Sequence, residues 1–99
     1  MKYSTERVIK VEWLGSEFTV TLRMITLREK SGLVTDSGRF DRHGYFERSV
    51  PKIEGPDVNG RKLSCGKDVL DTAGTDELFT KIMLELNGWE LEDEDRKNS

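Results

Sequence analysis

The chain is poor in the residues that mark several common classes of protein. Its 99 residues include one cysteine, Cys65, one histidine, His43, and two prolines. A single cysteine cannot form an internal disulfide, which excludes a disulfide scaffold and fits a reducing compartment. No apolar run is long enough to span a bilayer, and the first residues lack the apolar core of a signal peptide. We therefore expect a cytoplasmic protein with no membrane partner.

Clustered metal ligands and a catalytic set are also lacking. A zinc site draws three or four ligands from cysteine, histidine and carboxylate side chains, and no such spacing occurs here. A nucleophilic pair of Cys65 and His43 would require the fold to bring them together, because distance in sequence does not fix distance in space. A small, partly buried cysteine and a solvated histidine are commoner. We predict a protein that is not an enzyme, with no catalytic residues, no metal and no cofactor.

Residues 69–78 resemble segments of two unrelated families. The run Asp71-Thr72-Ala73-Gly74 is similar to the D-x-x-G switch segment of small GTPases, whose aspartate serves magnesium and whose glycine amide reaches the γ-phosphate. The same run resembles the Asp-Thr-Gly of retropepsin-like proteases, with Ala73 inserted. A GTPase also needs an upstream phosphate loop, whereas the only Gly-Lys pair, Gly66-Lys67, is followed by Asp68. The run is better explained as the loop that precedes a helix.

Charge is distributed unevenly along the chain. The formal net charge of −3 arises between residues 90 and 97, where five acidic residues outnumber two basic ones. Between residues 23 and 62, nine basic residues stand against six acidic ones, a net charge of +3. We therefore expect a dipolar molecule with a positive middle and a negative end.

The length allows one domain with one modest core. We predict a single globular domain over residues 1–91 and an acidic, disordered tail over residues 92–99. Because a small core supplies little stability beyond the cost of ordering the chain, homodimerisation is an open alternative.

The clearest fold signal is a β-hairpin over residues 7–27. A type II′ turn at Gly15-Ser16 would place Leu14 opposite Glu17, because the first turn residue needs a positive φ. The predicted pairs are then Trp13 with Phe18, Val11 with Val20, and Ile9 with Leu22. These six side chains share one face, since side chains alternate along a strand. A shift of one residue would turn charged side chains toward the core.

Residues 31–68 are polar and glycine-rich. A short second hairpin could join residues 33–35 to residues 39–41 around Asp36-Ser37. Asn59-Gly60 is the strongest turn signal, because a type I′ turn needs a positive φ at both positions. Pro51 and Pro56 cannot donate to a β-ladder, so a strand beside them would lie at an edge. We expect this region to be partly sheet and partly functional or mobile loop.

The C-terminal part predicts a helix that begins after Thr75, with Asp76 and Glu77 favourable in its first turn. One apolar stripe recurs at helical spacing: Leu78, Phe79, Ile82, Met83 and Leu86. Asn87-Gly88 is expected to end the helix, with Trp89 packing back on Leu84 and a short strand following. The predicted fold class is α+β, an antiparallel β-sheet built on the N-terminal hairpin with one C-terminal α-helix packed on one face.

Two surfaces are candidate partner-binding sites. Cations interleaved with aromatic rings are typical of grooves for single-stranded nucleic acid and are enriched at protein interfaces; such a strip, within residues 39–52, contains Arg39, Phe40, Arg42, Tyr45, Phe46 and Arg48. An acidic surface could imitate a phosphate backbone and bind a basic partner; its residues are Asp76, Glu77, Glu85, Glu90, Glu92 and Asp93. The alternatives are an exposed hairpin covering the sheet edge and a solvated terminus that aids solubility.

These features favour a small non-enzymatic interaction protein. We expect an accessory or inhibitory factor of the type encoded by phages and mobile elements, such as an anti-defence protein, that occupies a surface of a larger, nucleic-acid-processing protein. Small size and the lack of a catalytic set suggest this origin; no motif does. One alternative is a single-stranded nucleic-acid-binding module that uses the strip at residues 39–52. Another is a structural subunit that self-assembles through the hairpin edge.

Overall fold

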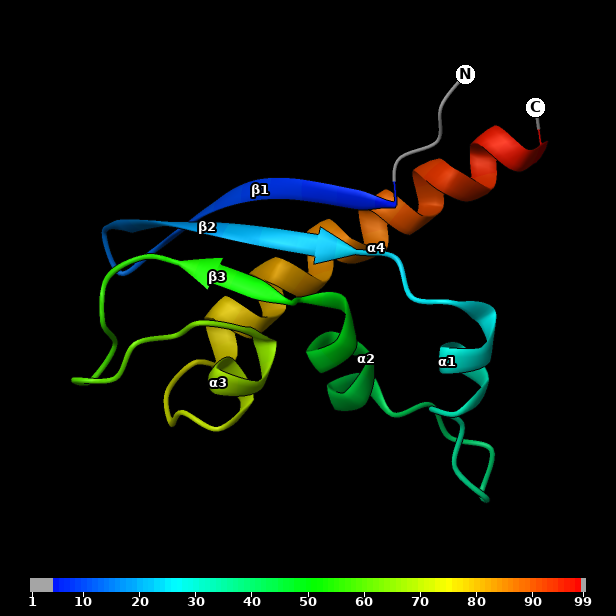
Figure 1. Cartoon of the computed structure of the whole chain (residues 1–99), viewed down its shortest axis with the longest axis horizontal. Coiled ribbons are helices and arrows are strands. Elements are labelled where there is room, and N and C mark those ends of the chain that lie inside the picture. Colours follow the sequence, from blue (N-terminus) through cyan, green and yellow to red (C-terminus); the bar gives the residue numbers. More distant parts are fainter. Residues whose placement is uncertain (1–4, 99) are drawn as a thin grey trace.

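A computed structural model describes the backbone of residues 5–98 and the side chains of residues 5–91. The elements are, in chain order, β1 (Glu6–Trp13), β2 (Ser16–Arg23), α1 (Leu27–Ser31), α2 (Arg42–Ser49), β3 (Lys52–Glu54), α3 (Gly66–Leu70) and α4 (Asp76–Asn98). The strands form one antiparallel sheet in the order β1-β2-β3, and α4 runs diagonally across one face of it (Figure 1). The predicted α+β class is confirmed.

The β1–β2 hairpin turns one residue earlier than predicted. Leu14 and Gly15 both have positive φ, 55° and 71°, as a type I′ turn requires. Trp13 therefore pairs with Ser16, and Val11 pairs with Phe18. The predicted Gly15-Ser16 turn is wrong, and each predicted pair is displaced by two residues. Because side chains alternate with a period of two, this displacement leaves the same apolar face buried.

The middle of the chain differs most from the prediction. Residues 42–49 form α2 instead of a hairpin, and the Asp41 carboxylate at its N-cap accepts a hydrogen bond of 3.0 Å from the Gly44 N–H. The predicted short hairpin of residues 33–35 with 39–41 is present: Val34 and Phe40 form a β-bridge, and backbone hydrogen bonds of 2.7 and 2.8 Å join the two segments on either side of it. The Asn59-Gly60 turn is confirmed by φ values of 54° and 79°. The edge position expected beside the prolines is confirmed too, since β3 lies at the end of the strand order.

Helix α4 does not end at Asn87-Gly88, so the predicted C-cap and closing strand are wrong. An isolated glycine inside a helix costs only about 1 kcal/mol. Trp89, only 5% exposed, extends the buried stripe of Leu78, Ile82 and Leu86 by one more turn. The free energy gained by burying Trp89 exceeds the cost of placing Gly88 inside the helix. Leu84 stays 67% exposed instead of being covered by Trp89. The backbone of residues 92–98, within the predicted disordered tail, continues α4, and the side chains of this segment lie outside the described residues.

The core lies between the inner face of the sheet and α4, with α2 and α3 closing one side. Phe18, Val20 and Leu22 of β2 are fully buried in this core, and Phe46 of α2 packs with them. The Phe46 ring meets the Phe79 ring of α4 with centroids 4.7 Å apart. This contact fixes the position of α2 relative to α4.

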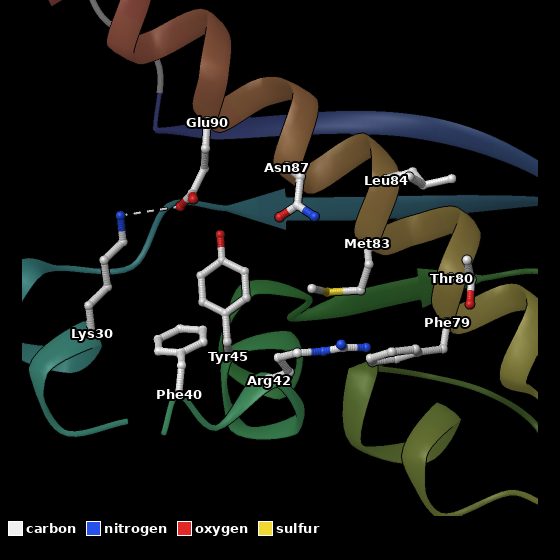
Figure 2. Close-up of a pocket in the computed structure, with 10 residues that line it drawn as sticks. All are labelled: Lys30, Phe40, Arg42, Tyr45, Phe79, Thr80, Met83, Leu84, Asn87 and Glu90. Carbon is white, nitrogen blue, oxygen red and sulfur yellow. Dashed lines mark ion pairs between the residues drawn. The ribbon is translucent and has the colours of Figure 1, made fainter. Parts of the chain in front are cut away.

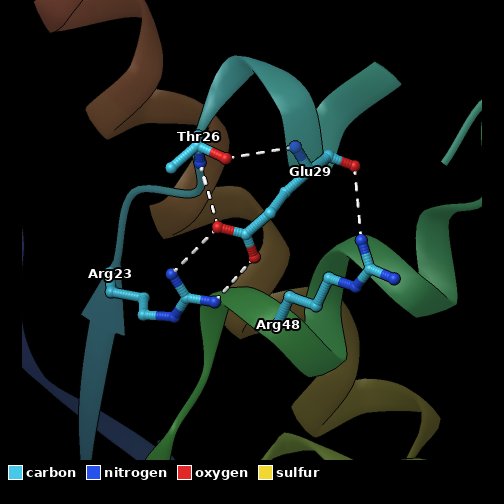
Figure 3. Close-up of polar contacts among 4 residues, drawn as sticks. All are labelled: Arg23, Thr26, Glu29 and Arg48. Carbon is cyan, nitrogen blue, oxygen red and sulfur yellow. Dashed lines mark hydrogen bonds and ion pairs between the residues drawn. The ribbon is translucent and has the colours of Figure 1, made fainter. Parts of the chain in front are cut away.

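Helix α1 is held in place by a cluster of polar contacts around Glu29 (Figure 3). Glu29 and Thr26 form a capping box with hydrogen bonds of 3.1 and 3.2 Å. Arg23 pairs with the Glu29 carboxylate at 2.9 Å, and Arg48 donates to the Glu29 carbonyl at 3.3 Å. The hydrogen bond from Arg23 is the main reason that the pKa of Glu29 is lowered. These contacts also position Lys30, which lines the site described next.

Candidate functional site: a groove between Phe40, α2 and α4

A groove opens between α4 on one side and α1, Phe40 and α2 on the other (Figure 2). Its cavity has a volume of about 420 Å³, which is within the range of small-ligand pockets. One wall consists of Lys30, Phe40, Arg42 and Tyr45. The α4 wall consists of Phe79, Thr80, Met83, Leu84, Asn87 and Glu90. Four residues of the predicted partner-binding set therefore meet here: Phe40, Arg42, Tyr45 and Glu90.

The walls of the groove are largely apolar although they are open to solvent. Phe40 is 45% exposed and Leu84 is 67% exposed, while Met83 and Phe79 are half-buried. The rings of Phe40 and Tyr45 contact each other with centroids 5.5 Å apart. Exposed apolar side chains that gather in a concave surface mark interaction sites, because they remain in contact with water until a partner covers them.

One end of the groove is closed by a polar cluster. Lys30 pairs with Glu90 at 3.3 Å, and Figure 2 shows the Tyr45 hydroxyl directed toward the same carboxylate. Burial, followed by the hydrogen bond to Glu90, raises the pKa of Tyr45 far above its ordinary value. Tyr45 is therefore a neutral, fixed side chain whose ring forms part of the wall.

A second cavity, of about 400 Å³, lies on the other side of Arg42. Its lining includes His43, Thr72 and Asp76, and it shares Arg42, Phe79 and Thr80 with the first cavity. The His43 ring meets the Phe79 ring edge-on, with centroids 5.6 Å apart. The two cavities are thus neighbours along α4, and Arg42 stands between them.

The structure divides the predicted basic and aromatic strip. Phe46 is fully buried in the core, and Tyr45 is 4% exposed. Arg48 turns toward α1, where it donates to the Glu29 carbonyl. Arg39 is exposed but does not line either cavity. The six residues therefore do not form one continuous surface on which bases could stack.

The acidic set is divided as well. Glu90 lies in the groove, and Asp76 lines the second cavity. Glu77 pairs with Lys81 one turn along α4 at 3.6 Å, and Glu85 is exposed. The side chains of Glu92 and Asp93 lie outside the described residues.

The three residues weighed for catalysis occupy different environments. Asp71 is exposed at the C-terminal end of α3, Cys65 is half-buried before α3, and His43 is exposed on α2. Of the two cavities described above, His43 lines one, and neither Asp71 nor Cys65 lines either. The geometry thus assigns these three residues no common site.

Of the α4 wall of the groove, the sequence predicted only Glu90 as a binding residue. Phe79 and Met83 were assigned to the core stripe, and Leu84 was assigned to a contact with Trp89. The available signal was Leu84 itself, a large apolar residue away from the buried stripe of an amphipathic helix. Once α4 continues past Gly88, Leu84 has no place in the core and belongs to the groove.

Three further findings bear on the class of protein. Among the described residues, no three His, Cys, Asp or Glu side chains are grouped so that they could hold a metal ion. Within the same part of the chain, no helix is both long and apolar enough to cross a membrane. Comparisons with family models, with curated proteins and with solved structures give no match.

Proposed function

We propose that this chain is a non-enzymatic interaction protein, an accessory or inhibitory factor that binds a larger protein through the groove between Phe40, α2 and α4. The observation that carries the proposal is the exposed apolar lining of that groove. Phe40 and Leu84 come from segments far apart in the sequence, yet both line one cavity of about 420 Å³. Large aromatic and apolar side chains that fill such a cavity supply most of the binding energy at protein interfaces.

Charge around the groove supports an oriented complex. Lys30 and Arg42 stand on one wall, and Glu90 stands on the α4 wall. Charges of both signs at the rim of an apolar surface steer association and fix the orientation of the bound partner. The burial of Tyr45 and Phe46 counts against the alternative of stacking on single-stranded nucleic acid.

The proposal is tested by affinity capture from the native host with three proteins: the natural chain, Leu84→Glu and Leu27→Glu. Leu27 is a matched control because it is 81% exposed and lies outside both cavities. Circular dichroism establishes that both variants fold. We expect a protein that is retained by the natural chain and by Leu27→Glu but lost with Leu84→Glu. Equal retention by both leucine variants, or no specific retention by the natural chain, would contradict the proposal.

A further inference from the structure

Arg42 lies where the two cavities meet. It is the first residue of α2, and its side chain reaches across the opening toward α4 (Figure 2). Arg42 lines both cavities, together with Phe79 and Thr80. A group bound to its guanidinium would therefore have one cavity on each side. An extended segment that followed α4 would have to pass this side chain.

The Arg42 guanidinium has no acidic partner among the described side chains. The other cation of the groove, Lys30, pairs with Glu90, and Lys81 of α4 pairs with Glu77 and donates to the Glu12 carbonyl of β1. The second carboxylate at the site, Asp76, lines the cavity beyond Arg42, and no ion pair joins the two. An arginine presents five N–H donors in a planar fork that matches a carboxylate. The apolar walls partly enclose Arg42, so an ion pair between its guanidinium and a bound carboxylate would be screened less by salt than an ion pair on an open surface.

The lining beside Arg42 indicates what must accompany the carboxylate. Phe79, Met83 and Leu84 line the cavity from α4, and Phe40 lines it from the opposite wall, beside Tyr45. The volume of about 420 Å³ is enough for a large aromatic or aliphatic side chain. Thr80 and Asn87 also line the cavity from α4. The Asn87 amide can hydrogen-bond to a passing backbone, and the Thr80 hydroxyl, which donates to the Asp76 carbonyl, can still accept a hydrogen bond.

From this arrangement we infer that the groove binds a short segment of its partner protein in which an Asp or Glu carboxylate pairs with Arg42 and a neighbouring large apolar side chain fills the cavity. The inference rests on the proposed function and specifies the partner's chemistry. A polyphosphate chain fits less well, because the other cation that lines the groove, Lys30, is already paired with Glu90, and Asp76 lines the cavity beyond Arg42. A single carboxylate needs only Arg42.

The test begins with a random dodecapeptide display library selected on the immobilised full chain. We expect the enriched peptides to combine an acidic residue with an adjacent Trp, Phe, Leu or Met. The best peptide is then synthesised with a fluorescent label, both as selected and with its acid replaced by the amide. Fluorescence anisotropy measures the binding of both peptides to the natural chain, to Arg42→Gln, to Leu84→Glu and to the control Arg28→Gln, an exposed arginine outside the groove.

Arg42→Gln is expected to weaken binding of the acidic peptide about tenfold, which corresponds to about 1.4 kcal/mol, because the hydrogen-bonded charge pair is lost. The amide peptide should bind the natural chain and Arg42→Gln equally, and Arg28→Gln should behave like the natural chain. Two outcomes would overturn the inference but not the proposed function: selected peptides that lose affinity for Leu84→Glu but contain no acidic residue, or acidic peptides that bind Arg42→Gln as tightly as the natural chain. Peptides indifferent to Leu84→Glu would overturn both. Tighter binding of labelled oligothymidine, lost with Arg42→Gln, would also overturn the inference.

Discussion

At the scale of single residues, Leu14 is the clearest example of local strain. It has a φ of 55° in the hairpin turn and is 73% exposed, so it gains little from packing. A left-handed conformation costs most residues about 1–2 kcal/mol, and asparagine tolerates it better. We expect Leu14→Asn to raise the free energy of unfolding by about 0.5–1 kcal/mol, as measured by urea denaturation. Leu27→Asn, at an exposed position without positive φ, should give no such gain; a loss at Leu14 would refute the turn assignment.

Glu29 provides a prediction about pH. The pKa of its carboxyl group is lowered in the folded state, chiefly by the hydrogen bond from Arg23. A lowered pKa means that the ionised carboxylate stabilises the folded state above its ordinary pKa, and that this contribution disappears as the pH falls through the lowered value. Glu29→Gln should therefore lower the Tm at neutral pH, and the difference from the natural chain should shrink in acid. Glutamine can still complete the capping box, so the comparison isolates the charge.

Glu47→Gln is the matched control for this measurement. Glu47 is exposed on α2, and no contact of its side chain is seen among the described residues. Its Tm difference from the natural chain should stay the same across the pH range. If the Tm difference between Glu29→Gln and the natural chain also stayed the same across the pH range, the contact between Arg23 and Glu29 would not be formed in solution.

At the scale of elements, the sequence predicted those features that depend on periodicity. Alternation in β1 and β2 identified the buried face, and helical spacing identified the stripe on α4 that includes Ile82. Glycines, which often mark turns and helix ends, were less reliable guides to where each element ends. Gly15 marks a turn but does not decide whether it occupies the first or the second turn position. Gly88 has the residue type of a helix end, yet the burial of Trp89 one residue later favours continuation.

The groove was harder to predict because it depends on tertiary structure. Arg42 and Phe40 were predicted to be interaction residues from their chemistry alone. Their neighbours come from α4, more than thirty residues later, and nothing local connects the two segments. The helical state of residues 42–49 decided which side chains of the strip became core and which stayed exposed. Composition cannot report that choice, since Phe40 and Phe46 are the same residue type with opposite burial.

Gly88 also gives a prediction at the element scale. A Cβ added there would meet nothing within 4 Å, and Gly88 has no positive φ, so its conformation does not require glycine. Alanine favours an interior helical position over glycine by about 1 kcal/mol. Gly88→Ala should therefore raise the free energy of unfolding by about 1 kcal/mol in chemical denaturation and increase helical circular dichroism. A decrease in stability would contradict the uninterrupted course of α4.

At the scale of the whole molecule, part of the groove is built on the same core as the sheet: Tyr45 belongs to that core, and Phe79 and Met83 pack against it. Phe46 of α2 is fully buried, and its ring contacts Phe79 of α4, which lines both cavities. The core therefore holds α2 and α4, the two helices beside the groove, in place. Such a rigid site limits the entropy lost on binding, which favours affinity for a short segment.

This coupling leads to a prediction about cooperativity. Trp13 on β1 and Trp89 on α4 are each 5% exposed, so their fluorescence reports on the sheet and on the long helix together. Phe46→Ala should lower the free energy of unfolding by about 3–5 kcal/mol, because it leaves a cavity among fully buried neighbours. Phe46→Leu is the milder variant and should cost less, since it conserves more of the volume. For both, tryptophan fluorescence and far-ultraviolet circular dichroism should give one coincident transition. Two separate transitions, with the helical signal lost first, would show that α2 and α4 unfold independently of the sheet and that the groove is not a rigid site.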